Sequence, residues 1–375
     1  MKQYDVVVVG GGPAGSSAAY HLAQGGANVI VLDGKDVVGG RYKTCAGGFT
    51  PKLWQSFPRE VCEPAIERAV KTMRVAVGKQ QAAEVQADEP LCYMTMRSNL
   101  DRCLLQAALD AGAEFRQTKV VDVGPNGRLS VTLKGGEQLE AEKVIAADGV
   151  YSVVARKLGF PRHPRQLAAV EDEAYGDPLG DWSDTYEVIV ALGVRGYWWV
   201  FPKSDHLSTG FGAPQRHAKL IKGWTREYTE RHFEQVEHSI TGHHIPLRDP
   251  GYPSYRQGVF LAGDAGGFVD PCTGEGISWA AASGKAAAEA ILNENAEQYL
   301  KWTEHADCEF YAARAYRNLL IVRLTIQGRR TVSDEALWKN YFEIIQARKT
   351  YVEWFRTLST VKRAFAWAAD RLAPA

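Results

Sequence analysis

The 375-residue chain has no net charge, no paired cysteine motif and no long apolar run. Lysine plus arginine and aspartate plus glutamate number 44 each, so the overall charge does not favour nucleic acid or an anionic membrane as a partner. The six cysteines include no C-x-x-C pair, which argues against a zinc knuckle or a thioredoxin motif. Because no run of about 18 apolar residues occurs, we expect no helix that spans a membrane.

Two further absences narrow the class of protein. Met1 leads almost directly into an apolar strand without the layout of a signal peptide, so we expect a cytoplasmic protein, soluble or in peripheral contact with a membrane. His243 and His244 have no carboxylate or cysteine at ligand spacing, so they predict a turn or an interface and no metal site. No pattern in the sequence indicates the oligomeric state.

The chain begins with a βαβ unit. Residues 4–9, YDVVVV, read as a strand buried on both faces, and residues 27–33, ANVIVLD, read as a second strand. Between them, Gly10, Gly12 and Gly15 form G-x-G-x-x-G, which permits a tight turn, close approach of the backbone to a pyrophosphate, and close packing of helix on strand. The helix N-terminus then offers free N–H groups to phosphates. Asp33 ends the second strand and should accept hydrogen bonds from a ribose, which disfavours the 2′-phosphate of NADP in this site.

A second block favours FAD over NAD. Residues 259–281, VFLAGDAGGFVDPCTGEGISWAA, contain a buried strand, Asp264 and another glycine-rich turn that opens a helix. Asp264 can bind a ribityl hydroxyl, and the helix N-terminus at Gly276 and Ile277 can face the flavin edge where negative charge collects on reduction. NAD needs no such second site. Residues 96–105, with Arg97 at a helix start, and residues 144–159 fit the same cofactor.

The order of these elements predicts an α/β fold, α+β overall. We expect a Rossmann-type FAD-binding domain with βαβ units, an inserted and mostly antiparallel β-sheet domain, and a C-terminal helical part. The FAD-binding domain takes residues 1–70, 96–160 and 256–295, the substrate and catalytic domain takes residues 71–95 and 161–255, and the helical region takes residues 296–375.

Taken together, the blocks resemble the flavoprotein superfamily with the p-hydroxybenzoate hydroxylase fold and, within it, the geranylgeranyl reductase family. The segments that carry the closer resemblance are KTCAGGFTP (43–51), GYWWVFPKSDHLSTGFG (196–212) and GDAGGFVDPCTGEGI (263–277). The resemblance covers most of residues 1–295. It implies FAD contacts by the G-x-G-x-x-G glycines and by Ala14, Asp33, Cys45, Gly47, Arg97, Asp264, Gly274, Gly276 and Ile277, with a backbone contact at Val121 on the strand after the Arg97 helix. Asp33 departs from the glutamate that many relatives have.

The resemblance also implies a reaction, the reduction of isolated carbon–carbon double bonds in a prenyl chain. Such a reduction takes a hydride from reduced flavin N5 and a proton at the other carbon. The chain has no second G-x-G-x-x-G, so electrons must come from NADPH bound without a domain of its own or from a ferredoxin-like protein. The expected substrate is a prenyl lipid or a prenyl diphosphate, with Arg195, Lys203 and the C-terminal arginines as candidate phosphate contacts.

An aromatic stretch could serve this chemistry. Alternate side chains of a strand share one face, so Tyr197, Trp199 and Phe201 should face the ligand cavity and Trp198 the other side. Aromatic faces stabilise developing positive charge, and a dry wall prevents water from capturing it. Core packing between the sheet and the flavin domain is the alternative for this face. Cys45 is the candidate catalytic residue, as a proton relay or substrate contact, against the alternative that it is an inert buried filler.

Two other functions remain open. A flavin-dependent monooxygenase or halogenase has the same fold, and YWWVFP distantly resembles the halogenase motif Trp-x-Trp-x-Ile-Pro. A reductase of a quinone-like lipid or an electron-transfer flavoprotein is the third reading. Residues 350–375 form an apolar stripe at helical spacing that we expect to pack on the protein; the alternative is an interfacial membrane helix. The stripe consists of Tyr351, Trp354, Phe355, Leu358, Val361, Phe365, Ala368 and Leu372.

Overall fold

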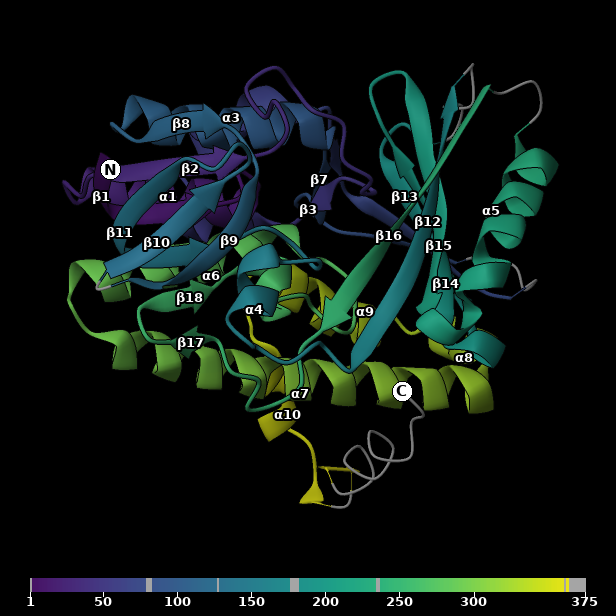
Figure 1. Ribbon diagram of the computed structural model, residues 1–375. Coiled ribbons are helices and arrows are strands. Elements are labelled where there is room, and N and C mark those ends of the chain that lie inside the picture. Colours follow the sequence, from purple (N-terminus) through teal and green to yellow (C-terminus); the bar gives the residue numbers. More distant parts are fainter. Residues whose placement is uncertain are drawn as a thin grey trace.

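Two large sheets stand side by side in the computed structural model, and one long helix runs along both of them (Figure 1). The structure describes residues 2–78, 83–126, 128–175, 182–233, 237–360 and 362–363. The α/β class predicted from the sequence is confirmed, because the first sheet is mainly parallel with helices packed on it and the second is mainly antiparallel.

The first sheet contains the predicted βαβ unit. Its strands follow the order β17-β18-β11-β1-β2-β8, all parallel except the edge strand β17. The bounds are β1 Lys2–Val9, β2 Val29–Asp33, β8 Glu114–Gln117, β11 Gln138–Ala146, β17 Tyr255–Arg256 and β18 Val259–Leu261. The consecutive valines of β1 are buried because both faces of this sheet are covered.

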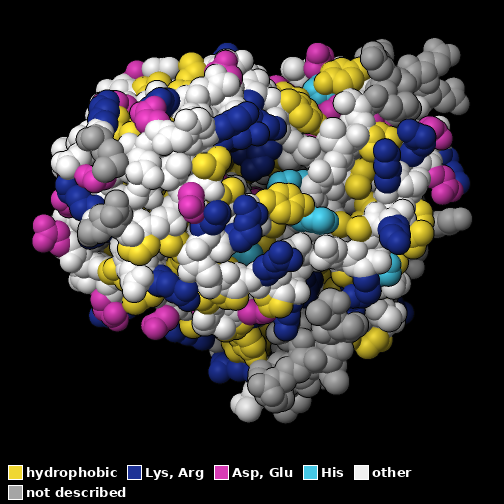
Figure 2. Space-filling model, in the orientation of Figure 1, with side chains coloured by type: hydrophobic (Ala, Val, Ile, Leu, Met, Phe, Trp, Pro, Cys, Tyr) yellow, Lys and Arg dark blue, Asp and Glu magenta, His cyan; other side chains and the backbone are white. Residues whose placement is uncertain are grey.

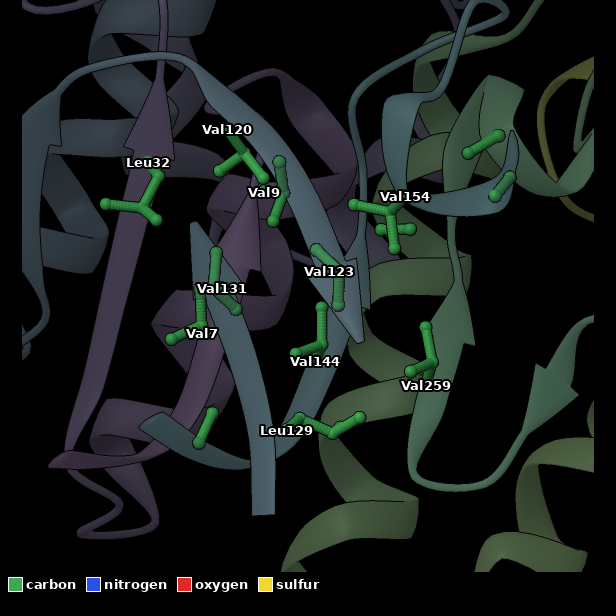
Figure 3. Packing of buried hydrophobic residues seen from close by; sticks show 14 of the residues in the cluster. Val7, Val9, Leu32, Val120, Val123, Leu129, Val131, Val144, Val154 and Val259 are labelled. Carbon is green, nitrogen blue, oxygen red and sulfur yellow. The ribbon is translucent and has the colours of Figure 1, made fainter. Parts of the chain in front are cut away.

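Three helices cover one face of the first sheet, and a β-hairpin covers the other. The helices are α1 Pro13–Gln24, α3 Arg97–Asp110 and α6 Ile277–Leu292. Small residues let α1 and α6 approach closely, since a Cβ on Gly284 would lie only 2.0 Å from the carbonyl oxygen of Ala14. On the opposite face, β9 Val120–Asn126, β10 Arg128–Leu133 and α4 Val153–Lys157 enclose a valine-rich core (Figure 3).

The second sheet contains the aromatic stretch. Its strands follow the order β16-β12-β15-β14-β13-β5-β6 and are antiparallel except for the parallel pair β13–β5. The bounds are β5 Thr72–Val77, β6 Ala83–Gln86, β12 Arg165–Tyr175, β13 Thr185–Ala191, β14 Gly196–Pro202, β15 His206–Pro214 and β16 Glu237–Leu247. The helix α5, Ala218–His232, covers one face of this sheet; the sequence reading did not anticipate it, although Ile221, Trp224 and Tyr228 recur at helical spacing.

A small third sheet joins the two large ones. It has the order β3-β7-β4, with bounds Gly48–Phe49, Cys92–Met94 and Arg68–Val70, and the short helix α2, Arg59–Cys62, lies near it. The strand β7 falls within residues 71–95, which the sequence reading gave to the substrate domain, but it pairs outside the second sheet. The division into domains stays our proposal.

The C-terminal region is helical, as the sequence suggested. It contains α7 Ala296–Gln327, α8 Arg329–Val332, α9 Glu335–Ile345 and α10 Tyr351–Arg356. The 32 residues of α7 extend about 48 Å at 1.5 Å per residue, which lets this helix pass beneath both sheets (Figure 1). Within the described residues, no helix is both long and apolar enough to cross a membrane.

The expected stripe over residues 350–375 is only partly continuous. The helix α10 ends at Arg356, and the chain leaves helical geometry over residues 357–359. Tyr351 is buried, and Trp354 and Phe355 pack with it against α7, so the described part of the stripe packs on the protein. Val361 and residues 364–375 lie outside the described residues.

Candidate active site

A cavity of about 780 Å³ extends from the first sheet to the second. Most residues that the sequence singled out line it: Gly10, Gly12, Ala14, Asp33, Cys45, Gly47, Arg97, Tyr197, Trp199, Phe201, Asp264, Gly274, Gly276 and Ile277. Gly15 and Val121 are not among its lining residues. Val121 lies on β9 with 42% of its surface exposed, and the strand directly after the Arg97 helix is β8; Val120 and Lys119 line the cavity instead. A backbone contact at Val121 stays a prediction.

The three glycines of the first motif have different roles. A Cβ on Gly15 would lie 1.8 Å from the carbonyl oxygen of Gly10, and a Cβ on Gly10 would lie 2.2 Å from that of Ala147, so both positions are filled by backbone. A Cβ on Gly12 would meet only Arg41 Nη2 at 3.5 Å and Arg97 Nη2 at 4.0 Å. Gly12 therefore faces open space beside two guanidinium groups, which is a cradle suited to a pyrophosphate.

The N-termini of two helices, α1 and α6, face this cavity. Gly12 precedes α1 and Gly276 precedes α6, and neither provides a side-chain cap. The positive end of the α1 dipole is therefore available to phosphates. In the first turn of α6 the Ser278 amide donates to Glu275 Oε1 at 2.7 Å, so an electron-rich ring edge would meet the remaining amides of that turn. Gly274 adopts a φ of 76° in the turn before α6, and Tyr197 donates a hydrogen bond to the carbonyl oxygen of Thr273 in the same turn.

Asp33 lies at the end of β2, where a ribose would be bound. Its Oδ2 accepts hydrogen bonds from the Gly11 amide at 2.8 Å and from Arg41 Nη1 at 2.7 Å. Arg97 is held by Asp101 through two hydrogen bonds of 2.8 and 2.9 Å. Arg41 Nε is buried without a hydrogen-bond partner among the described residues. Sequence reasoning missed Arg41, although it lies only eight residues beyond the acid that it pairs with.

Asp264 is placed opposite α1, in the turn that follows β18. Burial alone would raise the pKa of Asp264, but the neighbouring His243 and the charges of Lys43 and Arg97 outweigh it and lower that pKa. His243 Nε2 lies 3.7 Å from Asp264 Oδ2. His244 points elsewhere and contacts the hydroxyl of Tyr151 at 2.6 Å. No cluster of three metal-ligating side chains occurs in the described part of the chain.

The loop that carries Cys45 is fixed by two buried ionisable residues, Glu171 and Lys203. The Cys45 amide donates to Glu171 Oε1 at 3.2 Å. Lys203 Nζ donates to the carbonyl oxygens of Ala46 at 2.6 Å and Thr95 at 3.0 Å, and its side chain is fully buried. The suggestion that Lys203 contacts a phosphate at the cavity mouth is therefore wrong, because its ammonium group is buried and donates its hydrogen bonds to backbone carbonyl oxygens. Arg195 does line the cavity.

The aromatic side chains of β14 alternate between the two faces of the sheet, as expected for a strand. Tyr197, Trp199 and Phe201 line the cavity, whereas Trp198 stacks on Phe211 on the other face, with ring centroids 4.1 Å apart. Cys272 also lines the cavity, and burial raises the pKa of its thiol to about 12, as expected for an inert cysteine.

Beyond the aromatic stretch the cavity becomes apolar. Aliphatic and aromatic side chains from β5, β13, α7 and α9, with Leu91 before β7 and Leu192 after β13, form its walls. Those from the four elements are Met73, Val75, Tyr186, Val188, Val190, Leu320, Ile321, Leu324, Trp338, Tyr341 and Ile345. The polar half, in contrast, is lined by many lysines and arginines, and Figure 2 shows such side chains gathered near the middle of the visible face. The cavity therefore suits a ligand with an anionic end and, beside it, a long apolar one.

Comparisons with known proteins agree with this geometry. Residues 5–177 match the family described as lycopene cyclase protein. The chain is 32% identical to digeranylgeranylglycerophospholipid reductase 2 of Methanothermobacter thermautotrophicus, over 77% of this chain and 79% of that protein. The chloroplastic geranylgeranyl diphosphate reductase of rice (Oryza sativa subsp. japonica) is 30% identical, over 83% of this chain and 71% of the rice protein.

The chain belongs to the geranylgeranyl reductase family. The resemblance seen in the sequence is thus confirmed. Among solved structures, a geranylgeranyl bacteriochlorophyll reductase-like protein from Thermoplasma acidophilum superimposes with a TM-score of 0.74 at 22% identity, covering 98% of this chain and 96% of that one. A flavin-dependent brominase superimposes with a TM-score of 0.77 at 17% identity, covering 99% of this chain and 100% of the brominase. At such identities these two structures show that the fold is shared.

The residues of the polar half fit the FAD that this family and fold imply. Gly12, Arg41 and Arg97 would hold the pyrophosphate, Asp33 would contact the ribose, and Asp264 and the start of α6 would hold the flavin end. The fit rests on the open space at Gly12 and on the unpartnered Nε of Arg41.

Proposed function

We propose that the protein reduces isolated carbon–carbon double bonds of a prenyl chain. The observation that carries the proposal is the continuity of one cavity, from the FAD cradle at Gly12, past Tyr197 and Trp199, to the apolar walls formed by β13 and α9. The family relatives whose names include geranylgeranyl diphosphate or digeranylgeranylglycerophospholipid support the same substrate class, a prenyl diphosphate or a prenyl lipid.

The residues of this chain have three tasks in such a reaction. FAD, when bound and reduced, supplies the hydride. The apolar walls of β5, β13, α7 and α9 hold the prenyl chain and exclude water from the site of charge development. The rings of Tyr197 and Trp199 present aromatic faces that stabilise positive charge at the tertiary carbon. The Cys45 loop, anchored by Lys203, forms part of the wall beside them.

Electron supply and location extend the proposal. NADPH or a small ferredoxin-like protein would reduce the flavin. We place the protein in the cytoplasm, with peripheral contact to membranes that hold prenyl lipids.

The test is an anaerobic turnover experiment. The FAD-loaded protein, reduced with dithionite, is mixed with geranylgeranyl diphosphate or an archaeal-type prenyl ether lipid, and products are identified by mass spectrometry. Gain of two hydrogen atoms per double bond without oxygen is the expected result. Product that forms only when oxygen is admitted would instead identify a monooxygenase or halogenase, and flavin reoxidation with a quinone but no saturated lipid would identify an electron carrier.

A further inference from the structure

A row of ionisable side chains leads from the surface to the cavity. Asp205 Oδ1 contacts His206 Nδ1 at 2.7 Å, and His206 Nε2 contacts Glu173 Oε2 at 2.9 Å. Glu173 and Glu171 lie two residues apart on β12, so their side chains share one face of the strand, the face that lines the cavity at Glu171.

Burial changes sharply along this row. The side chain of Asp205 is 74% exposed, whereas those of His206 and Glu173 are 3% and 2% exposed. Such a gradient is what a path for protons from solvent into a dry cavity requires. Burial alone would lower the pKa of His206, but its hydrogen bonds to Glu173 and Asp205 raise that pKa above its ordinary value and so favour the imidazolium.

Glu171 is the last acid of the row. Its Oε1 accepts hydrogen bonds from the Tyr42 hydroxyl at 3.0 Å and the Cys45 amide at 3.2 Å, while its Oε2 is buried without a partner among the described residues. Burial and then the charge of Glu173 raise the pKa of Glu171 to about 8, although Lys203 opposes the shift. The titratable and charged groups that face Glu171 are therefore Tyr42, Cys45, Glu173 and Lys203, and the balance leaves it mainly neutral at pH 7.

We propose that Glu171 protonates the alkene and that Glu173, His206 and Asp205 restore its proton from solvent. The proposal rests on the proposed function. The hydride, with both electrons, comes from reduced flavin and forms a C–H bond at one alkene carbon. The O–H bond of Glu171 breaks, and its proton forms the C–H bond at the other carbon, which leaves a carboxylate.

The carboxylate then regains a proton along the row. His206 Nε2 gives its proton to Glu173, and the proton passes on to Glu171, whose Cα lies about 6.6 Å along the strand, through a bridging water. The neutral ring that remains has its proton at Nδ1; once this proton has exchanged to Nε2, Nδ1 takes a new proton from the solvent side at Asp205. The row thus separates the acid used in each turnover from the source that reloads it.

Replacement of the acid tests the first half of the proposal. Glu171→Gln keeps an acceptor for Tyr42 and Cys45 but has no proton to give, and the matched control Glu187→Gln changes a buried glutamate on the opposite face of the same sheet. We expect single-turnover product formation with geranylgeranyl diphosphate to slow about 10²–10⁴-fold in Glu171→Gln and to stay unchanged in Glu187→Gln. Formate should restore part of the rate in Glu171→Ala. Undiminished product from Glu171→Gln overturns the proposal, whereas no product from the unaltered protein overturns the proposed function.

The reloading step is tested with His206→Phe. The new ring keeps the stacking on Tyr175, where the centroids are 4.5 Å apart, but cannot carry a proton. We expect a normal first turnover, since Glu171 begins protonated, and steady-state turnover slowed at least tenfold with a larger solvent isotope effect. A purely structural role of His206 would slow both phases, and equal steady-state rates would overturn the relay.

Infrared spectroscopy provides a readout that does not depend on turnover. The protein at pH 7 should show the carbonyl band of a neutral carboxylic acid that disappears in Glu171→Gln and persists in His206→Phe. If the unaltered protein has no band that this substitution removes, the assignment of Glu171 as the proton donor is overturned, whatever lipid the protein reduces.

Discussion

The indole of Trp199 lies across the face of Gly210 on the neighbouring strand. A Cβ on Gly210 would be 2.2 Å from Trp199 Cζ2 and 2.4 Å from the carbonyl oxygen of Val170, so nothing larger than glycine fits there. The two residues are register partners in the β14–β15 pair. Gly210 on β15 thus leaves free the space that the indole of Trp199 on β14 fills in the cavity wall.

This relationship predicts opposite outcomes for two neighbouring glycines. Gly210→Ala should destabilise the protein by about 1–3 kcal/mol, because the backbone contact cannot relax, and should also displace the indole. Gly212→Ala is the control, since its Cβ would meet Trp199 only at an ordinary 3.8 Å. Urea unfolding followed by tryptophan fluorescence measures both. Equal stability of the two variants would contradict the role assigned to Gly210.

Lys203 should be needed for the Cys45 loop and not for phosphate binding. Lys203→Met removes the donor to the carbonyl oxygens of Ala46 and Thr95, and a buried acceptor left without a donor costs about 1–3 kcal/mol. We expect lower stability and faster alkylation of Cys45 by a neutral thiol reagent. Lys134→Met, at an exposed position, serves as the control. A stable Lys203→Met protein with an unchanged alkylation rate would show that the Cys45 loop keeps its conformation without Lys203.

Gly12 and Gly15 should separate cofactor binding from folding. Gly12→Ala places a methyl group in the open cradle, 3.5 Å from Arg41 Nη2, so the protein should fold normally but bind FAD at least about tenfold more weakly, since the close backbone approach is lost. Gly15→Ala places a methyl group 1.8 Å from a carbonyl oxygen and should impair folding itself. Titration with FAD and thermal unfolding of the cofactor-free protein distinguish the two effects. Full FAD affinity in Gly12→Ala would show that the pyrophosphate does not bind against Gly12.

These contrasts show what the sequence could and could not predict. Strand–glycine–helix patterns are local, so the cradle at Gly12, Asp33 at a strand end and the alternation of Trp198 and Trp199 could all be read from residue order. The contacts of Glu171 and Lys203 with the Cys45 loop could not be read from residue order, because they join positions more than 100 apart in the chain. The helix α5 was missed because the strands around it dominated the reading of residues 165–255.

The apolar half of the cavity should set the length of the substrate. Val188 lines it, whereas Ile189, the next residue of β13, faces the other side of the sheet. Val188→Trp should shorten the longest prenyl chain that is reduced, and Ile189→Trp should not, because only the first side chain takes volume from the cavity. Competition among C10, C15 and C20 prenyl diphosphates, scored by mass spectrometry, gives the answer. A parallel loss for all three lengths in Val188→Trp would point to general damage.

The stability of the cofactor-free protein should depend on pH through Glu171. Its folded-state pKa of about 8 lies above the ordinary value of 4.5, so the native state binds more protons than the unfolded state between these values. The free energy of unfolding should therefore fall as pH rises from about 5 to 8, by at most about 1.4 kcal/mol per pH unit for this one proton. Burial raises the pKa of Glu275 to about 7 and adds a similar slope over a lower range.

Glu171→Gln isolates the contribution of this residue. The variant has no proton to lose at position 171, so its free energy of unfolding should fall less steeply between pH 5 and 8 and exceed that of the unaltered protein above pH 8. Urea unfolding at pH 5, 6.5 and 8.5 measures the slopes, with Glu304→Gln on the exposed side of α7 as the control. Identical slopes in Glu171→Gln and the unaltered protein would mean that Glu171 titrates like a solvated carboxyl and is not a neutral acid at pH 7.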